Sequence, residues 1–421
     1  MLRSIVLIRI IDYFCEVVGL SKKTIYLDYA ATTPTRKEVL RAAMPYLTNV
    51  YGNPSSFHST GLEAKNAVMS ARKTVAEILH AKPSEIIFTG SGTESLNHAI
   101  KGIAFRELMQ GRRGTIITQV TEHHATLEIL DWLGKNGFKI VKLKPTVDGL
   151  VREEDLERAL EDNKDTILVT IMYANNEIGA IQPIRKLADI AHKYNVVFHT
   201  DACQGAEYLD INVENLGVDM MTLNGSKIYA FKGTGILYKK EWVEIETLIH
   251  GGGQERGARG GTENVAGIVA IATALELAEK EKKKESERLR KLRDYLIERI
   301  EKEIPFVLLN GSRTERLPNN VNFSFIGVEG ESVLLRLNEA GIRVSTGSAC
   351  SSRSLDPSHV IVGIREDHGL AHGSIRFSLG YETKKEHIDY TVEKLKEIIP
   401  FLRQLSAVWR EMVEKEKISI S

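Results

Sequence analysis

Short β-rich runs alternate with longer helix-period stretches between about residue 28 and residue 279, and this alternation restricts the possible folds more than any other feature. The clearest β-rich runs are Ile86–Phe88, Thr115–Ile117, Ile140–Leu143, Ile167–Ile171, Val196–Phe198 and Gly235–Tyr238. Strands that are separated by helices usually form parallel sheets, because each crossover places a helix on a face of the sheet. The sequence therefore predicts an α/β fold whose mostly parallel sheet is covered by helices on both faces.

A long helical run, from Val265 to about Ile304, follows the alternating part and connects it to a smaller α+β part. We therefore expect two domains. Residues 37–285 are expected to form the large domain, and residues 24–36 together with 286–421 the small one. Residues 1–23 would then be an N-terminal extension.

The first twenty residues are apolar enough to raise the question of a signal peptide or a membrane anchor. Arg9, Asp12 and Glu16 interrupt the run, so it is too short and too charged to span a membrane. Two interpretations stay open: an amphipathic helix that packs on the body of the protein, or a start codon placed too early.

The formal net charge is zero, from 56 basic and 56 acidic residues, and the Lys and Arg residues are spread along the chain. This balance argues against nucleic acid as the main partner. Three cysteines, Cys15, Cys203 and Cys350, stand at unrelated spacings, which fits a reducing cytoplasm better than a disulfide framework. No metal-ligand spacing occurs. We expect a cytoplasmic protein that binds neither nucleic acid, membrane nor metal.

Two ionisable residues follow two of the β-rich runs. Asp201 ends the run that begins at Val196, and Lys227 comes just after the run Asp219–Leu223. A pyridoxal phosphate enzyme needs an amine and a carboxylate at such strand ends, because the amine forms a Schiff base and the carboxylate keeps the pyridine nitrogen protonated. Taken alone, a strand-end aspartate and a solvated lysine are the more common explanation.

Two glycine-rich segments are candidates for phosphate binding. Thr89–Thr93 follows a strand and opens a helix near Glu94, so free backbone amides and the helix dipole would face an anion. The missing Gly-Lys-Ser/Thr ending argues against a nucleotide P-loop. The second segment, Gly251–Thr262, is too rich in glycine for a strand or a helix, and its two arginines and Gln-Glu pair argue against a flexible linker.

Cys350 lies among small residues in the segment Ser345–Ser352, with no large apolar side chain beside it. A structural cysteine is expected in an apolar run, whereas a reactive one needs access to solvent and a route to its thiolate. The loop from Ala349 to Pro357 carries few bulky anchors. We therefore expect Cys350 to be exposed, mobile and reactive.

The chain resembles the cysteine desulfurases, a family of class V aminotransferase-like, fold-type I pyridoxal phosphate enzymes, from about Tyr26 to about Tyr390. The motifs that carry the resemblance follow in the family's order: Tyr26–Pro34, Gly52–His58, Thr89–Ser95, Glu122–His123, Asn175–Gly179, Thr200–Gln204, Lys227–Tyr229, Gly251–Arg256, the Cys350 loop and Gly373–Gly380. The resemblance implies a pyridoxal 5'-phosphate cofactor, a mostly parallel seven-stranded sheet in the large domain, and an obligate homodimer.

Catalytic residues are assigned from this resemblance by motif position. Lys227 forms the Schiff base with the cofactor. His123 stacks on the pyridine ring and can move protons, and its neighbour His124 is expected to be a bystander. Cys350 is the nucleophile.

Binding residues follow from the same resemblance. Arg376 grips the substrate carboxylate, because its planar guanidinium makes a bidentate contact that lysine cannot reproduce. Asn175 and Gln204 hydrogen-bond the ring hydroxyl, and Asn175 also contacts the substrate. The remaining cofactor contacts are Gly92, Thr93, Asp201, Asn224, Ser226 and Thr262, of which Thr262 would reach the phosphate of the neighbouring subunit.

The chain departs from the family at the Schiff-base position. The usual pattern is Ser-x-His-Lys, and here Asn224 and Ser226 precede Lys227. Both can still donate hydrogen bonds to a phosphate, but the positive charge of a histidine is missing, so weaker cofactor affinity is expected. Cys203 is interpreted as a small apolar filler, with a redox role as the alternative.

The expected activity is therefore that of a cysteine desulfurase, which converts L-cysteine into L-alanine and leaves a persulfide on Cys350. The sulfur would pass to an acceptor, such as an iron-sulfur scaffold protein, or serve tRNA or cofactor thiolation. Alternatives are a selenocysteine lyase or a cysteine lyase on the same scaffold, and a cofactor-poor docking subunit for sulfur-trafficking proteins. The presence of Lys227, Asp201 and Cys350 argues against the docking subunit.

Overall fold

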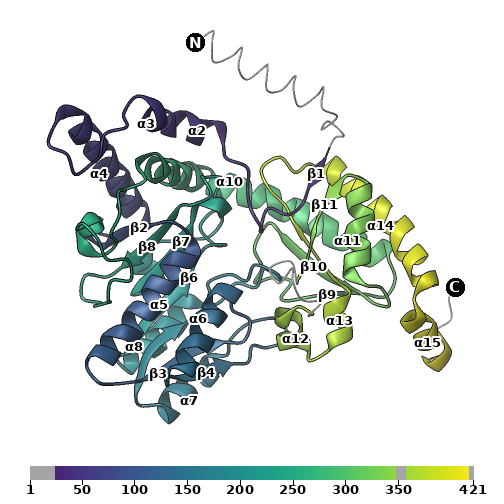
Figure 1. Ribbon diagram of the computed structural model, residues 1–421. Coiled ribbons are helices and arrows are strands. Elements are labelled where there is room, and N and C mark those ends of the chain that lie inside the picture. Colours follow the sequence, from purple (N-terminus) through teal and green to yellow (C-terminus); the bar gives the residue numbers. More distant parts are fainter. Residues whose placement is uncertain (1–23, 348–356, 417–421) are drawn as a thin grey trace, which may run out of the picture.

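A seven-stranded sheet is the largest element of the computed structural model, which describes residues 24–347 and 357–416 (Figure 1). Its strands lie in the order β2-β8-β7-β6-β5-β3-β4. Only β8 runs antiparallel to its neighbours, so the predicted mostly parallel α/β sheet is confirmed. The strands are β2 (Ile86–Thr89), β3 (Thr115–Gln119), β4 (Lys139–Leu143), β5 (Thr166–Thr170), β6 (Val197–Asp201), β7 (Met220–Asn224) and β8 (Gly235–Lys239).

Alternate side chains of these strands enter two different hydrophobic cores. Ile86 and Phe88 belong to one core, and Ile87 between them belongs to the other. The first core is shared with α4 (Ser59–Leu79), α7 (Glu153–Asp162), α8 (Ile184–Lys193) and the first half of α10 (Val265–Glu303). The second core is shared with α5 (Gly92–Met109) and α6 (His124–Lys135). The period of two along each strand thus gives the sheet two buried faces.

Shorter elements complete this part of the chain. They are α2 (Lys37–Ala43), α3 (Pro45–Thr48), α9 (Val213–Leu216) and three 3₁₀ turns, η1 (Pro83–Glu85), η2 (Gly225–Lys227) and η3 (Gln254–Gly257). The helix of the first glycine-rich segment begins at Gly92, two residues before the expected Glu94, because the side chain of Ser91 caps it by accepting the N–H of Glu94.

A third hydrophobic core lies around a four-stranded antiparallel sheet of order β12-β13-β10-β9. The strands are β9 (Val307–Leu309), β10 (Asn320–Phe325), β12 (Ser345–Thr346) and β13 (Ser374–Ser378). A separate parallel pair joins β1 (Ile25–Tyr26) to β11 (Ile342–Arg343). The helices here are α11 (Gly330–Glu339), α12 (His359–Arg365), α13 (His368–His372), α14 (Lys385–Leu405) and α15 (Ala407–Glu416).

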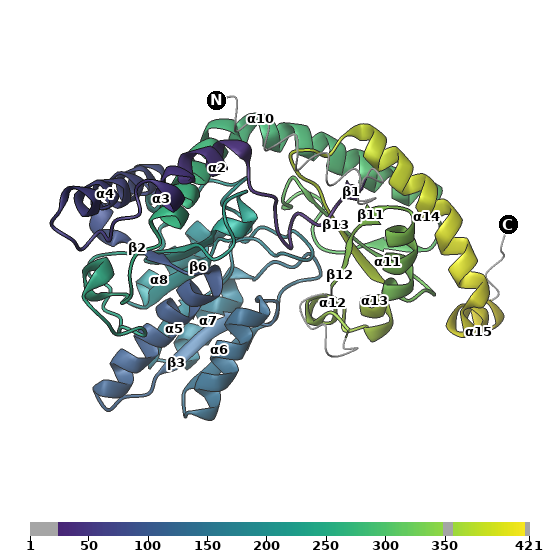
Figure 2. The ribbon, with the colours of Figure 1, turned by 45° about the horizontal axis from the view of Figure 1, so that its top comes forward.

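One long helix, α10, belongs to both halves (Figure 2). Its residues up to Leu275 enter the first core, and those from Leu289 to Ile300 enter the third. The helix ends at Glu303, one residue before the expected Ile304. The exact domain limits, 36/37 and 285/286, stay a prediction. Among the described residues no helix is both long and apolar enough to cross a membrane.

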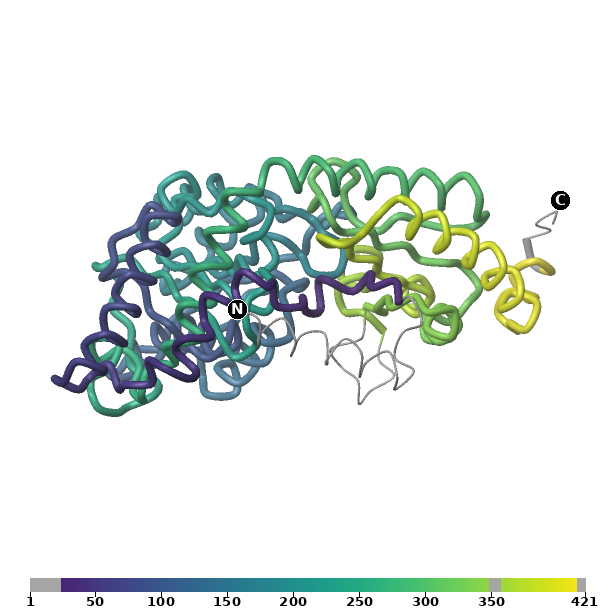
Figure 3. Tube along the Cα trace, turned by 90° about the horizontal axis from the view of Figure 1, so that it is seen from above, coloured from purple at the N-terminus to yellow at the C-terminus, as the bar shows by residue number. Residues whose placement is uncertain are grey.

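The N-terminal stretch from β1 to α2 crosses from the small sheet to the large one (Figure 3). It is held at both ends, because β1 pairs with β11 and the main chain of Thr33 bonds the carbonyl oxygen of Ser226 at 2.9 Å. Residues 30 and 31 are thereby placed beside the carboxyl ends of β6 and β7.

Gly235 offers a test of how tightly β8 is packed between its neighbours. A Cβ atom at this position would lie 2.5 Å from the main-chain carbon of Ser91, so the strand and the turn before α5 would have to separate. We expect Gly235→Ala to lower the free energy of unfolding by about 1–3 kcal/mol. Gly134→Ala is the matched control, since its Cβ would meet nothing nearer than 3.6 Å in helix α6. Denaturant unfolding of both variants measures the difference, and equal stability would contradict the packing argument.

Candidate active site

A cavity of about 300 Å³ lies at the carboxyl ends of β5, β6 and β7, where an α/β sheet usually binds its ligands. Eight residues that were assigned from the sequence line it: Gly92, Thr93, His123, Asp201, Gln204, Asn224, Lys227 and Arg376. The other lining residues are Ala30, Ala31, Leu96, Ala125, Met172, Ala174, Asn176 and Cys203. The structure therefore brings together residues that are far apart in the sequence.

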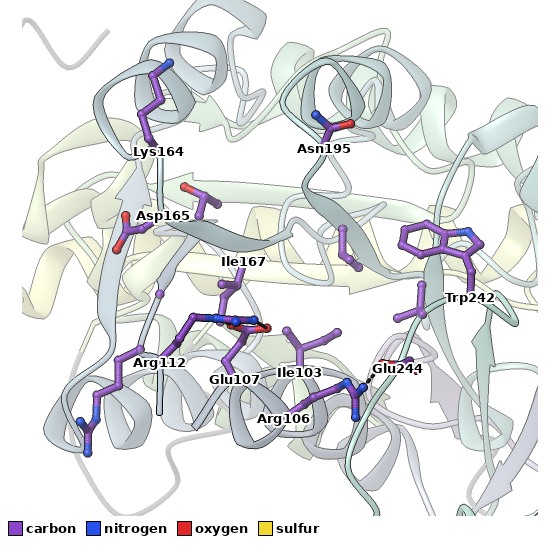
Figure 4. Close-up of a pocket in the computed structure, with 15 residues that line it drawn as sticks. Ile103, Arg106, Glu107, Arg112, Lys164, Asp165, Ile167, Asn195, Trp242 and Glu244 are labelled. Carbon is purple, nitrogen blue, oxygen red and sulfur yellow. Dashed lines mark hydrogen bonds and ion pairs between the residues drawn. The ribbon is translucent and has the colours of Figure 1, made fainter. Parts of the chain in front are cut away.

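A second cavity, of about 480 Å³, is larger but lies among the amino ends of the strands (Figure 4). None of the assigned residues lines it. Its charged side chains largely satisfy one another: Arg112 pairs with Glu107 at 2.7 Å, and Arg106 pairs with Glu244. The smaller cavity is the candidate active site, because an amine, a carboxylate, an imidazole and a guanidinium line it together.

Asp201 and Lys227 are held at the ends of adjacent parallel strands. Asp201 ends β6, is 6% exposed, and accepts the N–H of Cys203 at 3.0 Å. Lys227 follows β7 in the turn η2, and its Nζ donates to the carbonyl oxygens of Ala30, at 3.0 Å, and Ala31. The amine thus lies in the cavity on a support that the N-terminal stretch provides.

Asn224 shapes the turn that carries the lysine. Its Oδ1 accepts the N–H of Ser226 at 3.1 Å and the hydroxyl of Ser226 at 3.2 Å. Asn224 lines the cavity and Ser226 does not. A Cβ at Gly92 would lie 3.0 Å from both the Cβ of Asn224 and the Sγ of Cys203, so glycine lets the start of α5 approach this turn closely.

His123 caps α6 and lines the same cavity. Its Nδ1 accepts the N–H of Ala125 at 3.1 Å, which leaves the proton of the neutral ring on Nε2. Burial lowers the pKa of His123, and the carboxylate of Asp201 partly opposes this effect. The imidazole is therefore neutral near pH 7 and can stack on a flat ring or exchange a proton through Nε2.

Arg376 is fixed in β13 by two of its three guanidinium nitrogens. It is 4% exposed, its Nη2 pairs with Asp28 at 2.7 Å, and its Nη1 donates to the carbonyl oxygen of Asn176 at 3.0 Å. Its Nε is buried without a partner among the described residues. Arg376 also lines the cavity, so its guanidinium group is placed to pair with an anionic ligand there.

Gln204 and Asn175 are placed differently. Gln204 lines the cavity, and its Nε2 donates to the carbonyl oxygen of Ala30 at 2.9 Å. Asn175 does not line the cavity. Its Nδ2 donates to the carbonyl oxygen of Thr121 at 2.9 Å, and its Oδ1 accepts the main-chain N–H groups of Glu177 and Ile178. In this structure the side chain of Asn175 closes the turn, and Asn176 faces the cavity instead.

The second glycine-rich segment is anchored at two points. Glu255 forms a buried pair with Arg72 at 2.6 Å, and Arg259 pairs with Glu94 at 2.9 Å at the start of α5. Thr262 itself is exposed and does not line the cavity of its own chain. Cys350 lies outside the described residues.

Sequence reasoning missed the supporting residues of the site. The carbonyl oxygens of Ala30 and Ala31 receive the lysine amine, and only the motif Tyr26–Pro34 signalled that this stretch matters. Glu122 belongs to the motif Glu122–His123, which by itself indicates no role for it. It is fully buried, its Oε1 accepts the N–H of Met172 at 2.7 Å, and its Oε2 has no partner among the described residues.

Comparison with known proteins agrees with this geometry. Residues 25–391 match the aminotransferase class-V family. The chain is 52% identical over 390 residues to the cysteine desulfurase IscS of Dictyoglomus turgidum, covering 93% of this chain and 98% of the relative. The chain belongs to the cysteine desulfurase family. The family predicted from the sequence motifs is thus confirmed.

Two solved structures share the fold. A NifS-like protein superposes with a TM-score of 0.84 at 37% identity, covering 90% of this chain and all of the other. SspA in complex with cysteine superposes with a TM-score of 0.74 at 36% identity, covering 85% of this chain and 99% of the other. The predicted fold type I is therefore confirmed.

Glu122 lies buried beside the active site of this cysteine desulfurase family member, and its protonation should make the stability of the protein depend on pH. Burial raises the pKa of Glu122 to about 8, so the folded state keeps a proton that the unfolded state releases above its ordinary value of 4.5. The stability that this proton provides is present at low pH and is lost as the pH rises towards 8. Glu122→Gln removes the titration.

The free energy of unfolding of Glu122→Gln should therefore fall less than that of the parent between pH 5 and pH 8, by about 3–4 kcal/mol. Urea unfolding at both pH values measures this difference. The same pH dependence in parent and variant would show that Glu122 is already ionised in the folded protein.

Proposed function

We propose that the chain is a cysteine desulfurase, which removes sulfur from L-cysteine and releases L-alanine. The observation that carries the proposal is the shared cavity of Lys227, Asp201, His123 and Arg376. An amine, a carboxylate, a neutral imidazole and a buried guanidinium are the groups that amino-acid chemistry on pyridoxal phosphate requires. The 52% identity to a protein named cysteine desulfurase IscS, and the complex of SspA with cysteine, support the same reaction.

The residues present fit pyridoxal 5'-phosphate. Lys227 would bind its aldehyde, Asp201 would pair with the ring nitrogen, and His123 would stack on the ring. The phosphate would be held by backbone and side chains of Gly92, Thr93, Asn224 and Ser226. When bound, the cofactor withdraws electrons from the substrate Cα, which weakens the neighbouring bonds. Gln204, and Asn175 if its turn opens, would bond the ring hydroxyl.

Residues of the chain itself would bind the substrate and move protons. Arg376 would pair with the carboxylate of L-cysteine through the guanidinium group that it contributes to the cavity wall, which fixes the orientation of the amino acid. Asn175 would contact this carboxylate only after its turn has opened, since its amide is bonded to Thr121, Glu177 and Ile178. Lys227 moves a proton at the substrate Cα, and His123 moves one through Nε2, since its Nδ1 is occupied by the N–H of Ala125.

Cys350 is proposed as the nucleophile. Its thiolate attacks the sulfur of the bound cysteine, so that a new S–S bond forms on Cys350 while the Cβ–S bond of the substrate breaks. The electron pair of the broken bond stays with the substrate carbon, which takes up a proton and leaves as alanine. The persulfide on Cys350 is then passed to an acceptor, for which a protein such as an iron-sulfur scaffold is proposed, in the cytoplasm.

A homodimer with Thr262 acting on the neighbouring site completes the proposal. Large apolar side chains are exposed on one run of the chain from α2 to α4, with exposures of 42% at Leu40, 44% at Met44, 56% at Leu47, 78% at Tyr51, 93% at Phe57, 44% at Leu62 and 58% at Met69. Such a concentration favours contact with a second copy. The anchored loop that ends at Thr262 does not serve the cavity of its own chain, which agrees with a role in the partner.

Cys350→Ser tests the reaction. The variant keeps every residue of the described cavity, so it should still bind the cofactor and show a cysteine-induced change in absorbance. Alanine formation should fall by about 10³-fold or more, because a hydroxyl is a far weaker nucleophile towards sulfur than a thiolate. In the parent, brief exposure to cysteine followed by alkylation should place one extra sulfur on the peptide that contains Cys350.

Cys203→Ala is the matched control, since burial raises the pKa of the Cys203 thiol well above its ordinary value and keeps it protonated. This variant should form alanine like the parent. Alanine production by Cys350→Ser at the parental rate would indicate a lyase that needs no persulfide, and an extra sulfur on Cys203 would move the nucleophile.

Mixed dimers test the role of Thr262. Lys227→Ala should be inactive, and Thr262→Glu should lose activity because its carboxylate would repel the phosphate of the neighbouring site. A dimer of the two chains holds one intact site, so an equimolar, fully exchanged mixture should recover about a quarter of the parental activity. Exchange is verified with differently tagged parent chains. Mixed dimers that form and stay inactive would place Thr262 in its own chain's site.

A further inference from the structure

Glu177 lies between the two described ends of the segment that carries Cys350. Ser358, which follows this segment, donates its hydroxyl to Oε2 of Glu177 at 2.5 Å. Gly347, which precedes the segment, is so close that a Cβ atom there would lie 2.6 Å from the same Oε2 and 2.6 Å from the Cβ of Ser358. One carboxyl group thus contacts both ends at once.

The backbone of Glu177 is itself rigidly held. Its N–H donates to Oδ1 of Asn175 at 2.8 Å, and its carbonyl oxygen accepts from the side-chain amides of Asn320, at 3.2 Å, and Asn322, at 3.1 Å. The side chain is buried, with the residue 3% exposed. The carboxyl is therefore a fixed point that belongs to the same turn as Asn176 in the cavity wall.

A second contact holds the same end of the segment. His359 follows Ser358, and its Nε2 bonds the carbonyl oxygen of Glu122 at 2.8 Å. Its ring also lies 4.4 Å from the ring of His124. Residues 358 and 359 are thus attached to the two turns that carry Asn176 and His123 into the cavity.

The hydrogen bond from Ser358 to Glu177 can form whether Glu177 is ionised or neutral. Burial raises the pKa of Glu177 to about 7, while Ser358 from α12, Arg376 from β13 and His124 from α6 lower it. An ionised carboxylate and a neutral carboxyl group can both accept the Ser358 hydroxyl proton. An amide of the same shape can accept it as well.

We propose that Glu177 is a positioning residue for the sulfur-transfer step, which acts through Ser358 by fixing both ends of the Cys350 segment relative to the cavity. The proposal rests on the proposed function, in which Cys350 receives the sulfur. Glu177 touches neither substrate nor cofactor in this role. Its loss should therefore slow persulfide formation without weakening the binding of cysteine.

Variants at position 177 separate shape from charge. Glu177→Ala should lower kcat at least about tenfold with little change in KM, because misplaced reacting groups lose rate while the cavity still binds substrate. Glu177→Gln should stay within about threefold of the parent, since its carbonyl oxygen can accept the Ser358 hydroxyl. The cysteine-induced absorbance change should be normal in both, and alkylation after brief exposure to cysteine should reveal the slower persulfide formation in Glu177→Ala.

Variants at position 358 separate the contact from the helix cap, because the Ser358 hydroxyl also accepts the N–H of Ile361 at the start of α12. Ser358→Ala removes both interactions. Ser358→Asp keeps a cap acceptor but replaces the hydroxyl donor with a carboxylate, which repels the ionised Glu177 at a pH above 8. Both should show the reduced kcat, and the double variant Glu177→Ala/Ser358→Ala should lose no more than about twofold beyond either single variant, since the two residues act through one contact.

Three outcomes overturn the proposal: parental kcat in Glu177→Ala, parental kcat in Ser358→Asp, or fully additive losses in the double variant. If Glu177→Ala fails to fold, as judged by cofactor absorbance and thermal unfolding, the two Ser358 variants decide. A parent that forms no alanine and no persulfide would instead refute the proposed function. An active parent whose variants keep its kcat refutes the positioning role alone.

Discussion

The burial of both faces of the seven-stranded sheet is the constraint on which the rest of the structure depends. Neighbouring residues such as Ile86 and Ile87 enter different cores, so each strand is locked in register and in direction. The carboxyl ends of β5, β6 and β7 are then fixed side by side. Asp201 and Lys227 meet in one cavity because the cores, and not the residues themselves, decide where these strands end.

The sequence predicted this part of the molecule well, for a physical reason. Strands β3 and β5 are largely buried and contain short apolar runs, Ile116–Ile117 and Ile167–Val169, which short-range patterning detects. Strand limits shifted by one to three residues. Residues Val197–Asp201 form β6, for example, whereas the apolar run is Val196–Phe198. The strand is longer because its hydrogen bonding extends past the last apolar side chain.

Tertiary contacts explain what the sequence did not predict. Asn175 was expected in the cavity, but its amide accepts two hydrogen bonds within its own turn and donates one to the carbonyl oxygen of the distant Thr121, which only the folded chain shows. The carbonyl groups of Ala30 and Ala31 carry no side-chain signal at all, although they receive the amine of Lys227. The buried carboxyls of Glu122 and Glu177 looked like ordinary charged residues, because their burial depends on strands and helices that are distant in the sequence.

The residues that line the cavity are spread along the chain from Ala30 to Arg376. During synthesis, the first of them are therefore made long before the last. A growing chain can complete the large sheet once β8 has left the ribosome. At that point Arg376 has not yet been synthesised. Ala30 and Ala31, made early, depend on β11 and β13, made late, because β1 pairs with Ile342–Arg343 and the N–H of Ala30 bonds the hydroxyl of Ser378. A nascent chain can therefore bury most of its apolar surface long before it has a complete place for an amino-acid carboxylate, and the site matures only when the small sheet closes against the first residues of the chain.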